Sequence, residues 1–185
     1  MSPEPRIPPL PHDERDEATE ELLRGFRVDP DGPDINIMST LARHPTLLKP
    51  WAAFGGRLLY RGALVPRERE LLILRTGWNC DADYEWAQHV PIGLAAGLTS
   101  EEIARLATPR VDGGWSDDDD ALVCAADELH ADARISDGTW KRLAARLDEQ
   151  QLIELCMVVG QYHLVSFVLN SLGVEIDPGL EGLPR

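Results

Sequence analysis

A segment near the C-terminus, residues 149–173, is predicted to form a helix with apolar side chains around almost its whole circumference. A helix that is apolar on every side must be covered on every side. A chain of 185 residues suits one domain, and one domain of this size covers such a helix only partly. We therefore expect a central helix or a subunit interface, and a homo-oligomer. Its apolar residues are Leu152, Ile153, Leu155, Val158, Val159, Val165, Phe167, Val168, Leu169 and Leu172.

The rest of the chain is also predicted to be helical. Apolar side chains recur at helical spacing, Thr99 with Glu102 has the form of a capping box, and Ser116 precedes an acidic helix start. No alternating apolar and polar run is long enough for a strand. The sequence predicts an all-α, single-domain protein with further helices at 16–28, 35–43, 45–61, Val65-Pro66 to about Cys80, Asp81 or Asp83 to Gly97, 100–107, 117–132 and 136–147.

The two ends differ in composition from this domain, which we place at residues 16–176. Residues 1–15 are rich in proline, which fixes φ and removes backbone donors. We expect an extended arm that lies on a neighbouring subunit or is partly disordered. Residues 177–185 are predicted to be a C-terminal tail in loop conformation.

The charge balance excludes two classes of partner. The chain has 32 acidic and 18 basic residues and a net charge of −14, whereas nucleic acids and anionic membranes both bind clustered Lys and Arg. Polar residues interrupt the apolar C-terminal segment, so we expect no membrane span. No signal peptide is apparent, and three widely spaced cysteines indicate a reducing cytoplasm. The acidic run 117–120 is interpreted as a helix start and a solvated face, not as a metal site.

The densest group of reactive side chains follows the helix that starts at Pro66. Glu85 and His89 are four residues apart, so they share a helix face and can touch. Small residues at 82, 93 and 96 lie on that face and leave space or allow close packing. A carboxylate beside an imidazole is an acid–base pair. The alternative is an ordinary surface pair.

Glu70 lies on the apolar side of the preceding helix, beside Ile73 and Leu74. Apolar surroundings favour a protonated carboxylic acid, which makes Glu70 a candidate proton donor or shuttle. The alternative is a solvated acid in the first turn. Arg75 is a candidate partner of Glu70 or ligand of an anionic substrate, and its alternative is a surface ion pair.

Other candidates are weaker. Tyr84, Trp86 and Cys80 are candidate substrate contacts, although packing is the commoner role of such aromatic residues. His163 is interpreted as a core histidine. The histidines have no metal-ligand spacing and no Gly-rich phosphate loop is present, so we predict no metal, no nucleotide and no other cofactor.

Four segments of the chain together resemble the carboxymuconolactone decarboxylase/alkylhydroperoxidase D-like family. The resemblance rests on Val65-Pro-Arg-Glu-Arg-Glu-Leu-Leu-Ile-Leu-Arg75, Tyr84-Glu-Trp-Ala-Gln-His-Val90, Gly97-Leu-Thr-Ser-Glu-Glu-Ile103 and the helix that contains Gly160-Gln-Tyr-His163. It spans residues 40–175 and implies an all-helical fold assembled as trimers or hexamers.

The resemblance also bears on the chemistry. The peroxidase branch of the family uses Cys-x-x-Cys-x-x-x-His, and its two thiol positions correspond here to Ala82 and Glu85. A lone Cys80 cannot form the internal disulfide of that cycle. The decarboxylase branch, with Glu at the second position and the same histidine, is more similar and implies a cofactor-independent loss of CO2 from a lactone acid.

We therefore predict a cofactor-independent lyase or isomerase that moves protons through Glu70, Glu85 and His89 on a small, anionic lactone or enol acid. One alternative is a non-catalytic oligomeric protein that binds a small ligand. The other is a peroxidase-type protein with Cys80 as its single reactive thiol.

Overall fold

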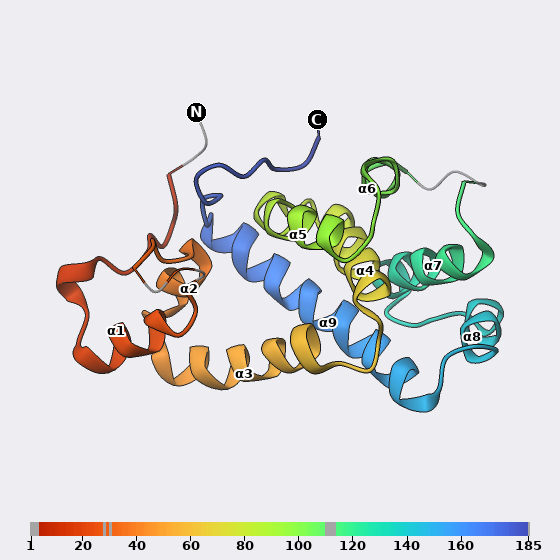
Figure 1. Cartoon of the computed structure of the whole chain (residues 1–185), viewed down its shortest axis with the longest axis horizontal. Coiled ribbons are helices and arrows are strands. Elements are labelled where there is room, and N and C mark those ends of the chain that lie inside the picture. Colours follow the sequence, from red (N-terminus) through yellow and green to blue (C-terminus); the bar gives the residue numbers. More distant parts are fainter. Residues whose placement is uncertain (1–3, 28, 30, 110–113, 185) are drawn as a thin grey trace.

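The computed structural model describes residues 4–27, 29, 31–109 and 114–184, and within these residues all regular structure is helical (Figure 1). This confirms the all-α prediction. A short 3-10 helix, η1 (His12–Glu14), precedes the α-helices. These are α1 (Glu17–Arg24), α2 (Asn36–Leu41), α3 (Pro45–Arg61), α4 (Pro66–Asn79), α5 (Asp83–Ala95), α6 (Ser100–Leu106), α7 (Asp117–Asp132), α8 (Asp137–Ala144) and α9 (Glu149–Leu172).

The main core lies where α4 packs against α5, α7 and α9. Every residue from Arg69 to Gly77 is buried, so α4 is enclosed on all sides instead of presenting the one-sided stripe that the sequence suggested. Leu71, Leu72, Ile73 and Leu74 are all fully buried. A helix enclosed in this way holds its polar side chains inside the protein as well, and this positions the candidate site.

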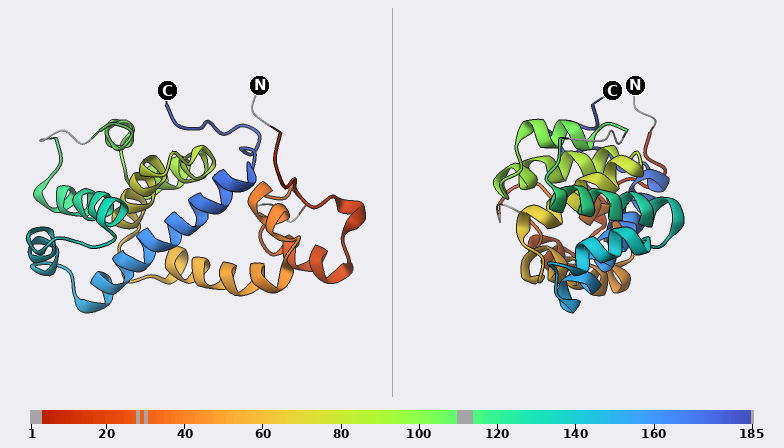
Figure 2. Two further views of the ribbon diagram at one scale, coloured as in Figure 1. Left: turned by 180° about the vertical axis from the view of Figure 1, so that it is seen from behind. Right: turned by 90° about the vertical axis from the view of Figure 1, so that its right-hand side faces the viewer.

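α9 crosses the middle of the molecule, with α3 on one side and α4 and α5 on the other (Figures 1 and 2). One face is buried through residues such as Leu155, Val158 and Val159. Another face exposes Ile153, Met157, Leu164 and Phe167. By length and composition α9 could cross a membrane, but half of its most apolar window is buried and core helices pass the same test.

Several predicted helix boundaries are confirmed by their caps. The Thr99–Glu102 capping box is formed, Ser116 accepts from the Asp119 backbone N–H, and Gly173 ends α9 in the left-handed region with φ of 69°. The predicted cap of α5 is wrong, because Ala82 is the N-cap residue. Asp81 instead has a φ of 49°, and Asp83 is the first helical residue.

Other boundaries differ at the ends. The first helix ends at Arg24, and Val28, to which we extended it, lies outside the described residues. Between α6 and α7 the described residues are 107–109 and 114–116.

The acidic start of α7 does more than interact with the helix dipole. Asp119 pairs with Arg67 at 2.7 Å, Asp120 pairs with Arg142 at 2.8 Å, and Asp118 lies 3.4 Å from Arg146. Arg67 also pairs with Glu102, and these partners raise the pKa of its guanidinium. The run therefore connects α7 to α4, to α8 and to the segment after α8, and Arg67 extends these contacts to Glu102 of α6.

The described part of the N-terminal arm packs on its own chain. The backbone N–H groups of Arg6 and Ile7 donate to the Leu172 carbonyl, and that of Leu10 donates to the Ser39 carbonyl. Arg15 pairs with Glu20 and Asp34. The prolines keep this segment extended and have no backbone N–H to donate. The other residues of the segment still donate backbone hydrogen bonds to α9 and α2. Residues 1–3 of the arm lie outside the described residues.

Candidate functional site

Glu70, His89 and Glu85 form one hydrogen-bonded row inside the protein. Nδ1 of His89 lies 2.7 Å from Oε2 of Glu70, and Nε2 lies 3.0 Å from Oε1 of Glu85. The exposed fraction is 0% for Glu70, 4% for Glu85 and 6% for His89. The surface-pair and solvated-acid alternatives are therefore wrong, because these side chains are buried and joined through both nitrogens of one imidazole.

Close packing of α4 against α5 brings the three residues together. Glu85 and His89 share one face of α5, as predicted, and that face meets Glu70 on α4. A Cβ atom at Gly93 would lie 3.1 Å from Leu74 Cδ1, 3.2 Å from Leu98 Cδ1 and 3.8 Å from Glu70 Cβ. Gly93 therefore lets the two helices approach closely enough for His89 to reach Glu70.

Two further residues complete the row, and the sequence interpretation missed both. Nε of Arg69 donates to Oε1 of Glu70 at 3.0 Å, and Arg69 is itself only 7% exposed. Tyr162 of α9 meets the His89 ring edge to face, with ring centroids 5.0 Å apart and planes at 88°. The only local signal for Arg69 was its place beside Glu70, and Tyr162 stood unremarked beside His163.

The surroundings of Glu70 differ from those we assumed. The argument for a proton donor rested on apolar neighbours, but both of its oxygens accept hydrogen bonds, one from Arg69 and one from His89. A carboxylate held this way orients the imidazole and balances positive charge. This geometry assigns Glu70 to positioning His89 instead of donating a proton itself.

The row holds His89 in its charged form. Burial alone would lower the pKa of His89, but the hydrogen bonds and negative charges of Glu70 and Glu85 outweigh it and raise the pKa to about 9. Burial, with Glu85 and Glu70 adding to it, raises the pKa of Tyr162 as well, so its phenol stays protonated. Two carboxylates then face two cations, Arg69 and His89.

This ionisation predicts how stability depends on pH. An unfolded imidazole titrates near ~6.5, and folded His89 titrates at about 9. The stabilisation is complete below the lower value and is lost as pH rises through the higher one, by about 3 kcal/mol in total. Urea unfolding at pH values from 6 to 9.5 should show this fall in the wild type. The His89→Gln variant should lack it, and parallel curves for the two proteins would contradict the assignment.

The row does not converge on a point that a metal ion could occupy. Glu70 and Glu85 contact opposite nitrogens of the His89 ring, so their oxygens face the imidazole from two sides. A metal site requires ligand atoms directed at one centre. The arrangement instead resembles a carboxylate–imidazolium–carboxylate relay, in which a proton moves along hydrogen bonds.

Arg75 lies outside the Glu70–His89–Glu85 row. Its Nε and Nη2 atoms donate to the two oxygens of Asp127 on α7 at 2.6 and 3.0 Å, and its Nη1 donates to the carbonyls of Leu106 and Thr108. The predicted pairing of Arg75 with Glu70 is wrong, because Arg69 is the guanidinium that contacts that carboxylate. Substrate binding by Arg75 stays a prediction, although the hydrogen bonds of its guanidinium to Asp127 are those of a brace between α4 and α7.

The two aromatic candidates are buried in packing positions. The Tyr84 hydroxyl donates to Asp177 at 2.6 Å and accepts from the Ile37 N–H at 3.2 Å. Burial, together with Asp177, raises the pKa of that phenol. Trp86 belongs to the main core. Tyr84 thus joins α5 to α2 and the C-terminal tail, and neither ring is among the contacts of the Glu70–His89–Glu85 row.

Cys80 follows the last residue of α4 and is partly buried. Its Sγ lies 4.0 Å from Nδ1 of His130, which in turn lies 3.0 Å from Nε2 of His163. The structure therefore brings Cys80 together with two histidines from α7 and α9, a grouping that their sequence spacing does not show.

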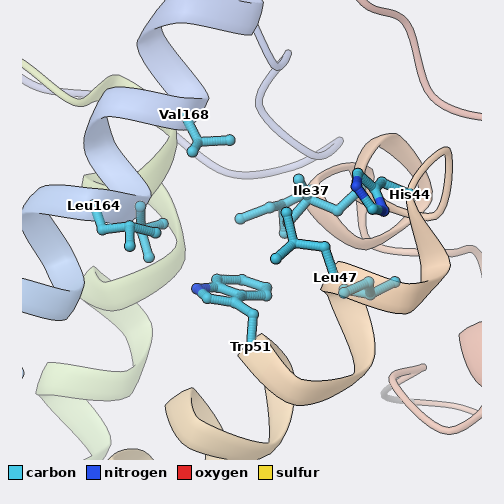
Figure 3. Close-up of a pocket in the computed structure, with 9 residues that line it drawn as sticks. Ile37, His44, Leu47, Trp51, Leu164 and Val168 are labelled. Atoms are coloured by element: carbon cyan, nitrogen blue, oxygen red, sulfur yellow. The ribbon is translucent and has the colours of Figure 1, made fainter.

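One apolar pocket of about 260 Å³ lies between α2, α3 and α9 (Figure 3). Trp51 of α3 faces Leu164 and Val168 of α9 across it. The Trp51 indole N–H has no hydrogen-bond partner within the described structure. None of Glu70, Glu85 and His89 lines this pocket, and its almost wholly apolar wall does not suit an anionic group.

The chain is similar to known proteins in sequence and in fold. Residues 45–127 match the model of the Carboxymuconolactone decarboxylase family. Comparison with curated proteins finds no match. The matched segment runs from α3 into α7 and contains Glu70, Glu85 and His89.

Solved structures share the fold along nearly the whole chain. A peroxidase-related protein of Ralstonia eutropha JMP134 with an alkylhydroperoxidase AhpD core has a TM-score of 0.82 at 15% identity, covering 96% of this chain and 95% of its own. A peroxidase-related protein of Silicibacter sp. TM1040 gives 0.80 at 15% identity with the same coverage. The debrominase Bmp8, solved with 2,3,4-tribromopyrrole, gives 0.77 at 13% identity, again covering 96% and 95%. These identities establish the fold alone.

Proposed function

We propose that this chain belongs to the carboxymuconolactone decarboxylase-like family and is a cofactor-independent acid–base catalyst. The match over residues 45–127 and the AhpD-like fold support the family assignment. Its substrate would be a small anionic lactone or enol acid, and its reaction a decarboxylation or isomerisation. The single observation that carries the proposal is the buried row Glu70–His89–Glu85, in which one imidazole joins two carboxylates.

Each member of the row has its own role in this proposal. Glu70 is fully buried and occupies Nδ1, so it orients the ring. The Glu85 side chain keeps slight exposure and occupies Nε2, so it is the carboxylate that a substrate would meet first. His89, charged at neutral pH, stores the proton that Glu85 passes on.

The order of these groups supports the proposed reaction class. Loss of CO2 from a lactone acid breaks a carbon–carbon bond and leaves its electron pair on the substrate as a dienolate. That carbon then needs one proton, which Glu85 would deliver and His89 would replace. An isomerisation uses the same groups in both directions, because a carboxylic acid that donates a proton to carbon becomes a carboxylate that can accept one.

Crystals soaked with a panel of small lactone acids and enolates test the proposal. We expect ligand density within hydrogen-bond reach of Glu85 or His89, and that ligand defines the substrate class for assays. Density confined to the apolar pocket at Trp51, or none at any concentration that leaves the crystals intact, would contradict it.

The near-complete burial of the row favours a second candidate, a non-catalytic oligomeric protein that binds a small ligand. In that case the row only stabilises the packing of α4 against α5. The two candidates differ in solution, because a stabilising row changes unfolding only, whereas a catalytic row also exchanges a substrate proton with water.

A peroxidase role for Cys80 is disfavoured by its environment. Burial raises the pKa of the Cys80 thiol, with only partial relief from a hydrogen bond to Ser166, whereas a peroxidatic thiol needs a lowered pKa. After mild peroxide in the presence of a chelator, a sulfenic-acid probe should label Cys80 no more than Cys156, the half-buried thiol of α9. Labelling of Cys80 about tenfold above Cys156 would restore the peroxidase alternative.

Self-association, as a trimer or hexamer, is part of the same proposal. Its support is the exposed apolar face of α9, where Ile153 is 61% exposed and Phe167 62% exposed. Light scattering should show a multiple of the chain mass for the wild type and a smaller species for Ile153→Glu. Trp140→Glu, an equally drastic change at an exposed residue of α8, is the control and should leave the mass unchanged. A monomeric wild type would contradict the proposal.

A further inference from the structure

Three potential metal ligands meet near the surface, and none of them belongs to the Glu70–His89–Glu85 row. They are Cys80 at the end of α4, His130 in the last turn of α7 and His163 in the middle of α9. One Sγ and two ring nitrogens lie within 4.8 Å of one another. The residues are far apart in sequence, so only the packing of three helices brings them together.

Two of the three separations lie close to those around one shared ion, and the third, between Sγ of Cys80 and Nε2 of His163, is within 4.8 Å. Around a tetrahedral Zn²⁺, with Zn–N near ~2.05 Å and Zn–S near ~2.3 Å, two nitrogens lie ~3.3 Å apart and a nitrogen and a sulfur ~3.6 Å apart. Here the two ring nitrogens are 3.0 Å apart, and Sγ of Cys80 is 4.0 Å from Nδ1 of His130. Shifts of a few tenths of an ångström would bring both separations to the ideal values.

Hydrogen bonds with neighbouring residues orient the His163 ring and the backbone of Cys80. Nδ1 of His163 donates to the Val159 carbonyl at 2.8 Å, which leaves the lone pair of Nε2 directed at the cluster. A backbone acceptor on the other ring nitrogen is the usual support of a metal-bound histidine. The Cys80 carbonyl accepts from Nδ2 of Asn170 at 2.8 Å, which fixes the backbone that carries the thiol.

One acid beside His130 already has other partners. Asp127, one turn before His130, accepts hydrogen bonds from Arg75 and Asn79, so it braces α4 against α7 and is not free to act as a fourth ligand. His130 is exposed, whereas Cys80 and His163 are partly buried. An ion held by these three residues would therefore keep a coordination position open to solvent, as in zinc sites that bind water or substrate.

We propose that Cys80, His130 and His163 bind one Zn²⁺ ion through Sγ, Nδ1 and Nε2, with at least one position left for water or a small ligand. A thiolate with two imidazoles selects a borderline-soft ion such as Zn²⁺ over Mg²⁺ or Ca²⁺. The site shares no residue with the proposed proton relay, and the proposal departs from the expectation, drawn from sequence spacing, that the protein binds no metal.

Substitution with Co²⁺ tests the site directly. The full chain, stripped with a chelator and reduced, is titrated with Co²⁺ while the near-ultraviolet and visible spectra are recorded. We expect a thiolate-to-cobalt charge-transfer band and the intense visible bands of four-coordinate cobalt, both saturating at about one equivalent per chain. Zn²⁺ should displace the cobalt and raise the thermal midpoint of the wild type.

Matched variants identify the ligands. Cys80→Ser should abolish the charge-transfer band and weaken Zn²⁺ binding by at least about 100-fold, whereas Cys156→Ser, which removes another half-buried thiol, should change neither. His130→Gln changes an exposed residue, so this variant should keep the fold and bind the metal more weakly. His44→Gln is the control for an exposed histidine outside the cluster.

Three results would overturn the proposal. The first is no cobalt spectrum at one equivalent, which means that the His130–His163 contact is only a hydrogen bond. The second is the same spectrum in Cys80→Ser as in the wild type. The third is binding that survives His130→Gln but is lost in His89→Gln, which would move the ion to the Glu70–His89–Glu85 row.

Discussion

Replacing Glu70 with alanine should lower the free energy of unfolding by about 3–5 kcal/mol. Glu70 is fully buried, and its oxygens accept from Arg69 at 3.0 Å and from His89 at 2.7 Å. Removing the carboxylate leaves two buried cations with only Glu85 to balance them, and an unpaired buried charge costs several kcal/mol. Urea unfolding at pH 7 measures the loss.

Two controls separate charge from shape in this experiment. Glu70→Gln keeps the volume and one acceptor but removes the charge, so it should lose less stability than Glu70→Ala. Glu101→Ala changes an exposed glutamate in the first turn of α6 and should stay within about 0.5 kcal/mol of the wild type. A loss below about 1 kcal/mol for Glu70→Ala would mean that the ion pairs do not hold the row together.

The second large effect is expected on turnover. Glu85→Gln should reduce kcat on an identified substrate by about 10²- to 10⁴-fold, the usual contribution of a positioned acid or base. Glutamine can still accept a hydrogen bond from Nε2 of His89 through its amide oxygen, so the packing is preserved while the ionisable acid–base group is lost. Circular dichroism and unfolding of the variant check that the fold is retained.

A variant that combines Glu85→Gln with His89→Gln tests whether the two residues act together. If Glu85 and His89 act in one relay, Glu85→Gln with His89→Gln should be hardly slower than the worse single variant, because groups that act as a unit are not additive. Glu101→Gln, an exposed change of the same chemistry, should keep wild-type kcat. Unchanged turnover in both single variants would remove the row from the mechanism.

Much of the fold was predictable because local rules and tertiary packing agree. Prolines at the first positions of α3 and α4, the capping box at Thr99 and the left-handed Gly173 each mark a helix end through chemistry within a few residues. The cap of α5 was predicted wrongly because Asp81 and Asp83 are both good cap residues, and the tertiary contact of Asp83 with the Leu183 N–H is invisible locally.

The site was predictable to the extent that it lies within one helix. The spacing of Glu85 and His89 directly gave their contact. The partner of Glu70 was not predictable, since Arg69 and Arg75 were both available and only the burial of α4 decides between them. Tyr162 and the Cys80–His130–His163 cluster depend on how α9 crosses α4 and α7, which no local pattern encodes.

Solvent isotope exchange tests the proposed proton transfer most directly. The wild-type protein is incubated in D2O with the panel of small lactone and enol acids, and mass spectrometry follows deuterium at carbon in substrate and product. We predict deuterium incorporation by the wild type and by Glu101→Gln, with a rate at least about 100-fold lower in Glu85→Gln. Wild-type protein that incorporates no deuterium into any member of the panel, or a Glu85→Gln variant that incorporates it equally fast, would contradict acid–base catalysis at this row.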